Sequence, residues 1–123
     1  MILTGDMSRH SLLIVDADPF LAGIYAHEFE KGSFDVFVAE SVEQAKQLLE
    51  KQKIEVVIID PDTVDLAWEF LRLKKLHLAK RLILTQLGQR EEIEKAQEEG
   101  VDAYLLKGHF VPSEICKKVL QLL

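Results

Sequence analysis

The chain has 123 residues and a formal net charge of −6, with 48% hydrophobic and 29% charged residues. This length and composition are typical of one globular domain with one core, and the acidic balance argues against a nucleic-acid-binding surface. No stretch approaches the roughly 20 apolar residues that a membrane-spanning helix needs, so we expect no membrane segment.

The first ten residues stand apart from the pattern that follows them. Residues 1–10 contain an acid and no long apolar run, so they do not resemble a signal peptide. We expect an N-terminal extension, or vector-derived residues before a native start at Met7, followed by a single domain over residues 11–123. The lone Cys116 excludes an internal disulfide and predicts a reducing, cytoplasmic location.

The first predicted elements are a strand, a helix and a second strand. An apolar run predicts a strand at about Ser11–Asp16. Asp18 then has the character of a helix N-cap, with Pro19 at the first helical position. That helix is expected to end at Gly32, and Asp35–Ala39 is predicted as the second strand.

The middle of the chain predicts two further helices around a buried strand. Ser41, with Gln44 three residues later, forms a capping-box pattern that opens the second helix. Ile54–Asp60 is a continuous apolar run of the kind that is buried on both faces of a sheet. A third helix is predicted over Asp65–Lys75.

The last third repeats the same alternation. Arg81–Thr85 is predicted as the fourth strand, Gln89–Glu99 as a helix closed by Gly100, Ala103–Lys107 as the fifth strand, and a final helix from Pro112 onward. The sum is five strand–helix units with short connections. We therefore predict an α/β, three-layer (βα)5 fold, a doubly wound parallel five-stranded sheet with helices on both faces.

Four of the predicted strands end on a side chain that can do chemistry. Asp16, Asp60, Thr85 and Lys107 stand at these ends, and the carboxyl ends of parallel strands meet in one crevice where ligands bind. Two facing carboxylates share a proton or a cation, and Mg²⁺ prefers such oxygen ligands. An ionised aspartate beside Mg²⁺ can form an aspartyl phosphate, so this spacing favours phosphoryl chemistry.

These residues lie in stretches that resemble the receiver domain of two-component response regulators, over about residues 11–123. The stretches are IVDADPFL, VVIID, LILTQ, EEGVDAYLLK and the terminal helix. The resemblance implies the flavodoxin-like strand order 2-1-3-4-5, which is known for this family. It further implies that Asp60 is the phosphoacceptor, Asp16 one of the acids that bind Mg²⁺, Thr85 the switch hydroxyl and Lys107 the phosphate-contacting lysine.

The resemblance also implies how such a domain works. It is not an enzyme beyond phosphorylating itself from a donor and losing the phosphate again, and a histidine kinase or phosphotransfer protein is the expected donor. Tyr104 matches the aromatic residue that swings inward on phosphorylation, and the backbone carbonyl of Asp62 would be a further Mg²⁺ ligand. A downstream protein is expected to bind the face formed by Gln89–Glu99, Ala103–Lys107 and the last helix. The segment around YLLKGHF resembles stand-alone bacterial receivers, and neither nucleic acid nor membrane is expected as a partner.

Several positions depart from the family pattern and keep an alternative open. Ala17 occupies the second acidic position, which should weaken Mg²⁺ binding. The loop PDTVDLAW after Asp60 lacks the usual signature, and Gly108 replaces a proline after Lys107. The alternative is a degenerate receiver that acts as a phosphorylation-independent protein-interaction module. A flavin-binding domain of the same architecture is disfavoured, because the turn DADPF has no phosphate cradle.

Overall fold

Five parallel strands form one sheet in the order β2-β1-β3-β4-β5, as predicted. The computed structural model describes residues 9–123. The strands are β1 (His10–Val15), β2 (Phe34–Ala39), β3 (Val56–Ile59), β4 (Lys80–Thr85) and β5 (Ala103–Leu106). His10 is thus the first residue of the sheet, and the rest of the predicted extension, apart from Arg9, lies outside the described residues.

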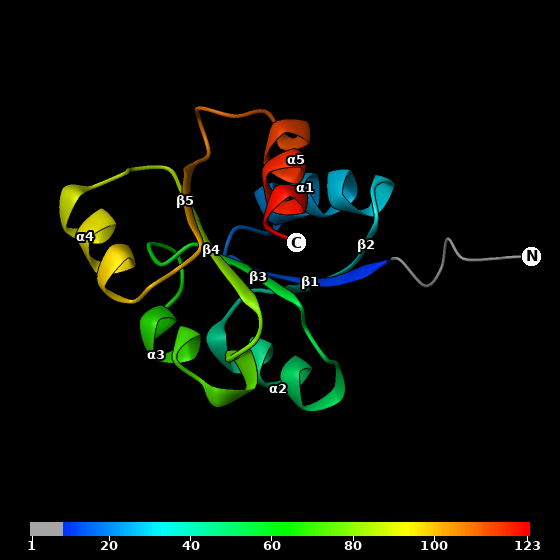
Figure 1. The fold of residues 1–123 in the computed structure, drawn as a ribbon, viewed down its shortest axis with the longest axis horizontal. Coiled ribbons are helices and arrows are strands. Elements are labelled where there is room, and N and C mark those ends of the chain that lie inside the picture. Colours follow the sequence, from blue (N-terminus) through cyan, green and yellow to red (C-terminus); the bar gives the residue numbers. More distant parts are fainter. Residues whose placement is uncertain (1–8) are drawn as a thin grey trace, which may run out of the picture.

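The helices cover both faces of the sheet (Figure 1). They are α1 (Pro19–Lys31), α2 (Val42–Lys51), α3 (Ala67–Leu71), α4 (Arg90–Glu98) and α5 (Pro112–Leu122), with a short 3-10 helix, η2 (Lys74–Leu76). Helices α1 and α5 pack on one face, where Leu12 and Ile14 of β1 point. Helices α2, α3 and α4 pack on the other, where Leu13 and Val15 point. The alternation of side chains along β1 therefore feeds two separate apolar layers. No helix within residues 9–123 is long and apolar enough to cross a membrane.

Two helix starts follow the capping residues that the sequence predicts. The Asp18 carboxylate accepts hydrogen bonds from the backbone N–H groups of Phe20 and Leu21, at 3.0 and 3.3 Å. The Ser41 hydroxyl accepts from the Gln44 N–H at 3.2 Å. Both bonds satisfy backbone donors that a helix N-terminus leaves without a partner.

The predicted third helix over Asp65–Lys75 is wrong in its extent. Leu66 has a φ of 61°, in the left-handed region that a bulky side chain rarely adopts, so α3 begins only after it. Leu73 is extended, which ends the helical run. The chain then turns through η2 and buries Leu76, which is 1% exposed. The chain thus buries Leu76 against the apolar layer by leaving the helical path, where one straight helix over residues 65–75 was predicted.

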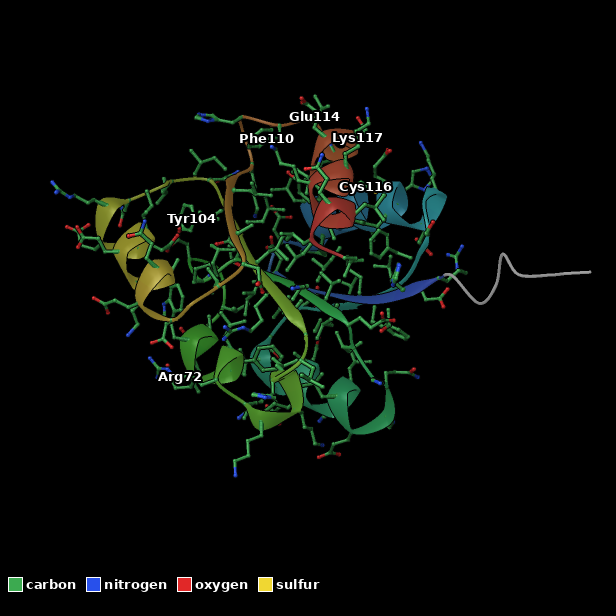
Figure 2. All side chains as sticks on the ribbon, viewed as in Figure 1. Arg72, Tyr104, Phe110, Glu114, Cys116 and Lys117 are labelled. Atoms are coloured by element: carbon green, nitrogen blue, oxygen red, sulfur yellow. The ribbon has the colours of Figure 1, made fainter. Side chains whose placement is uncertain are left out.

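Helix α4 is held mainly by polar contacts. Its only buried residue is Ala96. At its C-terminal end Arg72, which follows α3 (Figure 2), donates two hydrogen bonds to the Glu99 carboxylate at 2.8 and 2.5 Å. Arg81 donates to the backbone carbonyls of Glu99 and Gly100 at 3.2 and 2.9 Å. Few apolar contacts would have to break for α4 to shift.

Candidate functional site

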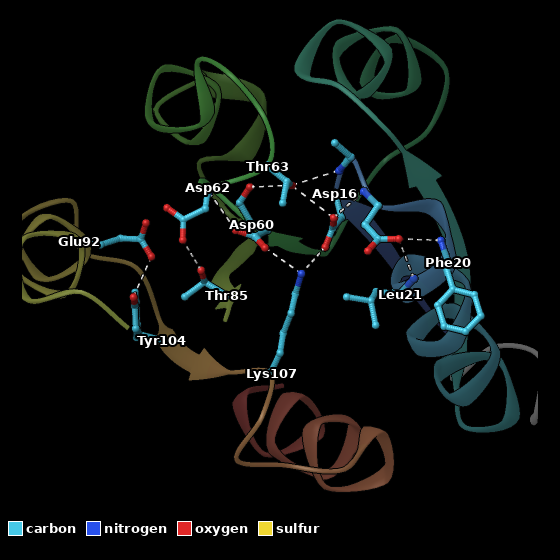
Figure 3. A network of polar contacts seen from close by, with 12 residues as sticks. Asp16, Phe20, Leu21, Asp60, Asp62, Thr63, Thr85, Glu92, Tyr104 and Lys107 are labelled. Carbon is cyan, nitrogen blue, oxygen red and sulfur yellow. Dashed lines mark hydrogen bonds and ion pairs between the residues drawn. The ribbon is translucent and has the colours of Figure 1, made fainter. Parts of the chain in front are cut away.

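The strand registers bring the predicted site residues to one edge of the sheet. Val15 of β1 lies opposite Ile59 of β3, so the next residues, Asp16 and Asp60, lie side by side. Thr85, the last residue of β4, is fully buried. Figure 3 shows Lys107, which follows β5, extending between the two aspartates.

Lys107 bridges the two carboxylates. Its Nζ atom lies 2.7 Å from Oδ2 of Asp16 and 2.7 Å from Oδ2 of Asp60. The side chains of Lys107, Asp16 and Asp60 are only 5%, 5% and 3% exposed. Burial alone would lower the pKa of Lys107, but its bonds to Asp16 and Asp60 outweigh burial and raise that pKa above its usual range. The ammonium therefore stays charged and compensates one of the two acids.

The second oxygen of each aspartate is bonded to the backbone. Oδ1 of Asp16 accepts from the Asp18 N–H at 2.8 Å, and Oδ1 of Asp60 accepts from the Asp62 N–H at 2.9 Å. Within residues 9–123, no buried side-chain nitrogen or oxygen lacks a hydrogen-bond partner. The carboxylates are thus held in fixed orientations, as a buried ion pair requires.

Thr63 belongs to the site although the sequence analysis did not single it out. Its hydroxyl donates to Oδ1 of Asp16 at 3.2 Å and accepts from the backbone N–H of Ala17 at 3.1 Å. It therefore connects the loop after β3 to the end of β1. Aspartate and threonine side chains commonly bond to nearby backbone in turns, and the sequence Asp-Pro-Asp-Thr was the signal that pointed to such a loop.

The side chain of Asp62 has a contact that was not predicted. We expected the backbone carbonyl of Asp62 to face the site. In the structure, its carboxylate oxygen Oδ2 accepts a hydrogen bond from Oγ1 of Thr85 at 2.6 Å. The hydroxyl that is expected to meet a phosphoryl oxygen is therefore bonded to a carboxylate.

Tyr104 is bonded to an acid on α4. Its hydroxyl donates to Oε1 of Glu92 at 2.7 Å, and Figure 3 shows Glu92 on the Asp62 side of the site. Burial, and then the neighbouring Asp62 carboxylate, raise the pKa of Glu92 to about 7. The many acids of residues 91–99 look alike in the sequence, so only the tertiary structure singles out Glu92.

Replacing Glu92 by glutamine is expected to flatten the pH dependence of stability. The pKa of Glu92 lies at about 7 in the folded protein against an ordinary value of 4.5, so between these values the folded state binds more protons than the unfolded state. The Glu92 contribution therefore makes the free energy of unfolding fall as pH rises through this window. Because Glu92 is only half-buried, solvent screening reduces the effect to about 1 kcal/mol.

Urea unfolding at pH 5 and pH 8 measures this difference. Glu92→Gln should lose less stability than the wild type between the two pH values. Glu91→Gln, at the exposed neighbouring position of the first turn, serves as the control and should keep the wild-type slope. Equal slopes for Glu92→Gln and the wild type would contradict the assignment.

Asp16 and Asp60 are the residues that could hold a divalent cation. Mg²⁺ is often bound through only one or two carboxylates while it keeps several waters, and this pair fits such a weakly held ion. Ala17 adds no carboxylate, and the ammonium of Lys107 lies between the two acids. Within the described part of the chain, no cluster of three or more His, Cys, Asp or Glu side chains is arranged to hold a metal.

Comparison with known proteins gives matches in fold. Neither a protein-family profile nor a curated protein matches the sequence. The chemotaxis response regulator CheY4 of Vibrio cholerae is 20% identical with a TM-score of 0.80, covering 94% of this chain and 99% of that chain. The receiver domain of the Francisella response regulator 1452 is 26% identical with a TM-score of 0.79, covering 93% and 96%. A Burkholderia pseudomallei response regulator with a phosphorylated aspartic acid, a calcium ion and citrate is 22% identical, with a TM-score of 0.74, covering 92% and 72%.

Proposed function

We propose that this chain, which has the fold of the CheY-like response regulator receiver domains, acts in phosphorelay signalling by accepting a phosphoryl group on Asp60. The observation that carries the proposal is the buried bridge in which Lys107 contacts both Asp60 and Asp16 at 2.7 Å. This bridge holds an ionised carboxylate and a fixed cation at the strand ends, beside the hydroxyl of Thr85. A nucleophile for phosphorus and a charge for its oxygens are thus present together.

The transfer would proceed as a displacement at phosphorus. A carboxylate oxygen of Asp60 forms a bond to the phosphorus of a donor phosphohistidine, the phosphorus–nitrogen bond breaks, and the imidazole leaves with the electron pair and takes up a proton. Lys107 would then pair with a phosphoryl oxygen in place of its present contact to Asp60. Mg²⁺, when held by Asp16 and Asp60, would neutralise further negative charge on the phosphoryl oxygens.

The response would pass through Thr85 and α4. A phosphoryl group adds about 1.5 to 2 negative charges and strong acceptor oxygens, which compete with Asp62 for the Thr85 hydroxyl. Asp62 lies beside Glu92, and Glu92 holds Tyr104. Movement of Asp62 would therefore reach the face formed by α4, β5 and α5, where a downstream protein is proposed to bind.

A degenerate receiver is the second candidate, and a specific observation favours it. Both aspartates already have two hydrogen-bonded oxygens, and Asp60 is only 3% exposed. The Thr85 hydroxyl, which a phosphoryl group would otherwise engage, is already bonded to the Asp62 carboxylate. In this case the domain would bind its partner in one fixed state, without phosphorylation.

Intact mass spectrometry after incubation with phosphoramidate and Mg²⁺ distinguishes the two candidates. The wild type should gain the mass of one phosphoryl group, and Asp60→Asn should gain none while its circular dichroism spectrum stays unchanged. Asp62→Asn is the matched control, because it removes a neighbouring acid and should still be labelled. No adduct on the wild type would favour the degenerate module, and labelling of Asp60→Asn would refute the assignment of the acceptor.

A further inference from the structure

Six lysines gather at the edge of the sheet that lies opposite the aspartate site. They lie on the segments that lead into β3 and β4, close to the N-terminal ends of these two strands. We call this set of lysines the basic edge: Lys46, Lys51, Lys53, Lys74, Lys75 and Lys80. All are exposed except Lys80, which is half-buried. They come from α2, from the segment before β3, from η2 and from the start of β4, so tertiary structure and not local sequence brings them together.

The basic edge is uncompensated by ion pairs. Among residues 9–123, none of its six lysines makes a salt bridge, whereas Lys31, Arg72, Arg90, Lys95 and Lys107 do. Two acids lie among these lysines. Glu50 is exposed, lines two of the hollows described below and makes no salt bridge within residues 9–123. The Glu55 carboxylate bonds to His10 at 3.0 Å and to the Ser11 N–H at 3.2 Å. Six of the 15 lysine and arginine residues thus stand on one side of a chain with a net charge of −6.

Apolar side chains lie between these lysines. Three adjoining hollows of about 440, 440 and 480 Å³ cross the basic edge. Leu49 and Leu73 line the first of them together with Lys46, Lys74 and Lys75. In the largest hollow, Leu78 is 90% exposed and Leu123 is 46% exposed. A partner that covers these exposed leucines would remove their apolar surface from water, which favours binding at this place.

We propose that the basic edge binds an acidic, amphipathic segment of a partner protein, whose apolar side chains enter the hollows while its carboxylates meet the lysines. Charge complementarity favours an acidic partner, and the leucines favour one that also carries apolar anchors, as a helix in a groove does. No phenylalanine, tyrosine or tryptophan lines the three hollows, and His77 is the one ring among their lining residues, so the surface lacks the row of stacking aromatic residues that single-stranded nucleic-acid binders use. This surface is separate from Asp60, and the proposal does not depend on phosphorylation.

A titration followed by ¹⁵N–¹H NMR tests the proposal on the whole chain. The probe is a synthetic helical peptide of about four turns with leucines on one face and glutamates on the other. Amide shifts should be confined to residues 46–54, 73–80 and 123. Lys53→Gln, Lys74→Gln and Lys75→Gln combined should weaken binding about tenfold, since three exposed charge pairs are lost and each contributes only modestly.

The matched control combines Lys31→Gln, Lys117→Gln and Lys118→Gln. These remove three lysines outside the basic edge, two of them on α5, which covers the face of the sheet opposite α2 (Figure 1), and should change the affinity less than twofold. Two further probes are the same peptide with serine in place of leucine and a DNA duplex of equal charge. The proposal is overturned if the leucine peptide shifts no amides at the basic edge, or if either further probe binds there as tightly.

Discussion

Replacing Lys107 by methionine is expected to destabilise the folded protein by about 3–5 kcal/mol, because it leaves two buried carboxylates without their shared cation. Methionine fills a similar volume, so the loss reflects charge and not a cavity. Asp16 and Asp60 each lose a contact of 2.7 Å and then repel one another across the end of the sheet. This is the largest single effect that the site predicts.

Chemical denaturation at neutral pH measures this loss. Lys117→Met, at an exposed position of α5, is the matched control and should change stability by less than about 0.5 kcal/mol. Adding Asp60→Asn to Lys107→Met should recover part of the loss, because only one buried charge then remains uncompensated, and the double-mutant cycle gives the coupling energy. A cost below about 1 kcal/mol for Lys107→Met would mean that the bridge contributes little to the fold.

Replacing Ala17 by aspartate is expected to tighten Mg²⁺ binding about tenfold or more. Ala17 follows Asp16 and is exposed, so a new carboxylate there remains hydrated in the absence of metal. A unit charge about 4 Å from another contributes about 1 kcal/mol in water, and a divalent ion doubles this. A gain of that size corresponds to more than a tenfold change in Kd.

Fluorescence of Trp68 follows the Mg²⁺ titration, because this residue of α3 is partly buried against the apolar layer and lies eight positions after Asp60. Ala17→Asn has nearly the same shape as Ala17→Asp without its charge, and it should bind Mg²⁺ as weakly as the wild type. The same Kd for Ala17→Asp and Ala17→Asn would mean that Mg²⁺ does not bind beside residue 17, either because it binds elsewhere or because it does not bind.

The fold could be predicted from the sequence because its signals are local and repeated. Each strand is an apolar run and each helix has its own periodicity, and the N-caps Asp18 and Ser41 are contained in a few residues. The parallel order then brings the strand ends to one edge, which is why Asp16, Asp60 and Lys107 could be expected to meet before any contact was known. The predicted strand order 2-1-3-4-5 is confirmed.

The parts that could not be predicted depend on long-range packing. The left-handed Leu66, the early end of α3 and the burial of Leu76 belong to one irregular connection, and no local pattern in the sequence encodes its path. The bond between Tyr104 and Glu92 depends on the position of α4 over β5, and similar glutamates surround it in the sequence. The roles of Asp60, Thr85 and Lys107 in phosphoryl transfer stay predictions until the adduct is measured.

The bridge at Lys107 also leads us to expect an order in the assembly of the chain. It joins residues 91 and 47 positions apart, so the two acids are synthesised long before the cation that compensates them. A chain that ends before β5 carries Asp16 and Asp60 at adjacent strand ends with no ammonium between them, and strands β1 and β3 then repel where they should meet. We expect β1 and β3 to pair stably only after β5 and α5 have been synthesised. The core would then form late, once Lys107 is available to compensate the two acids.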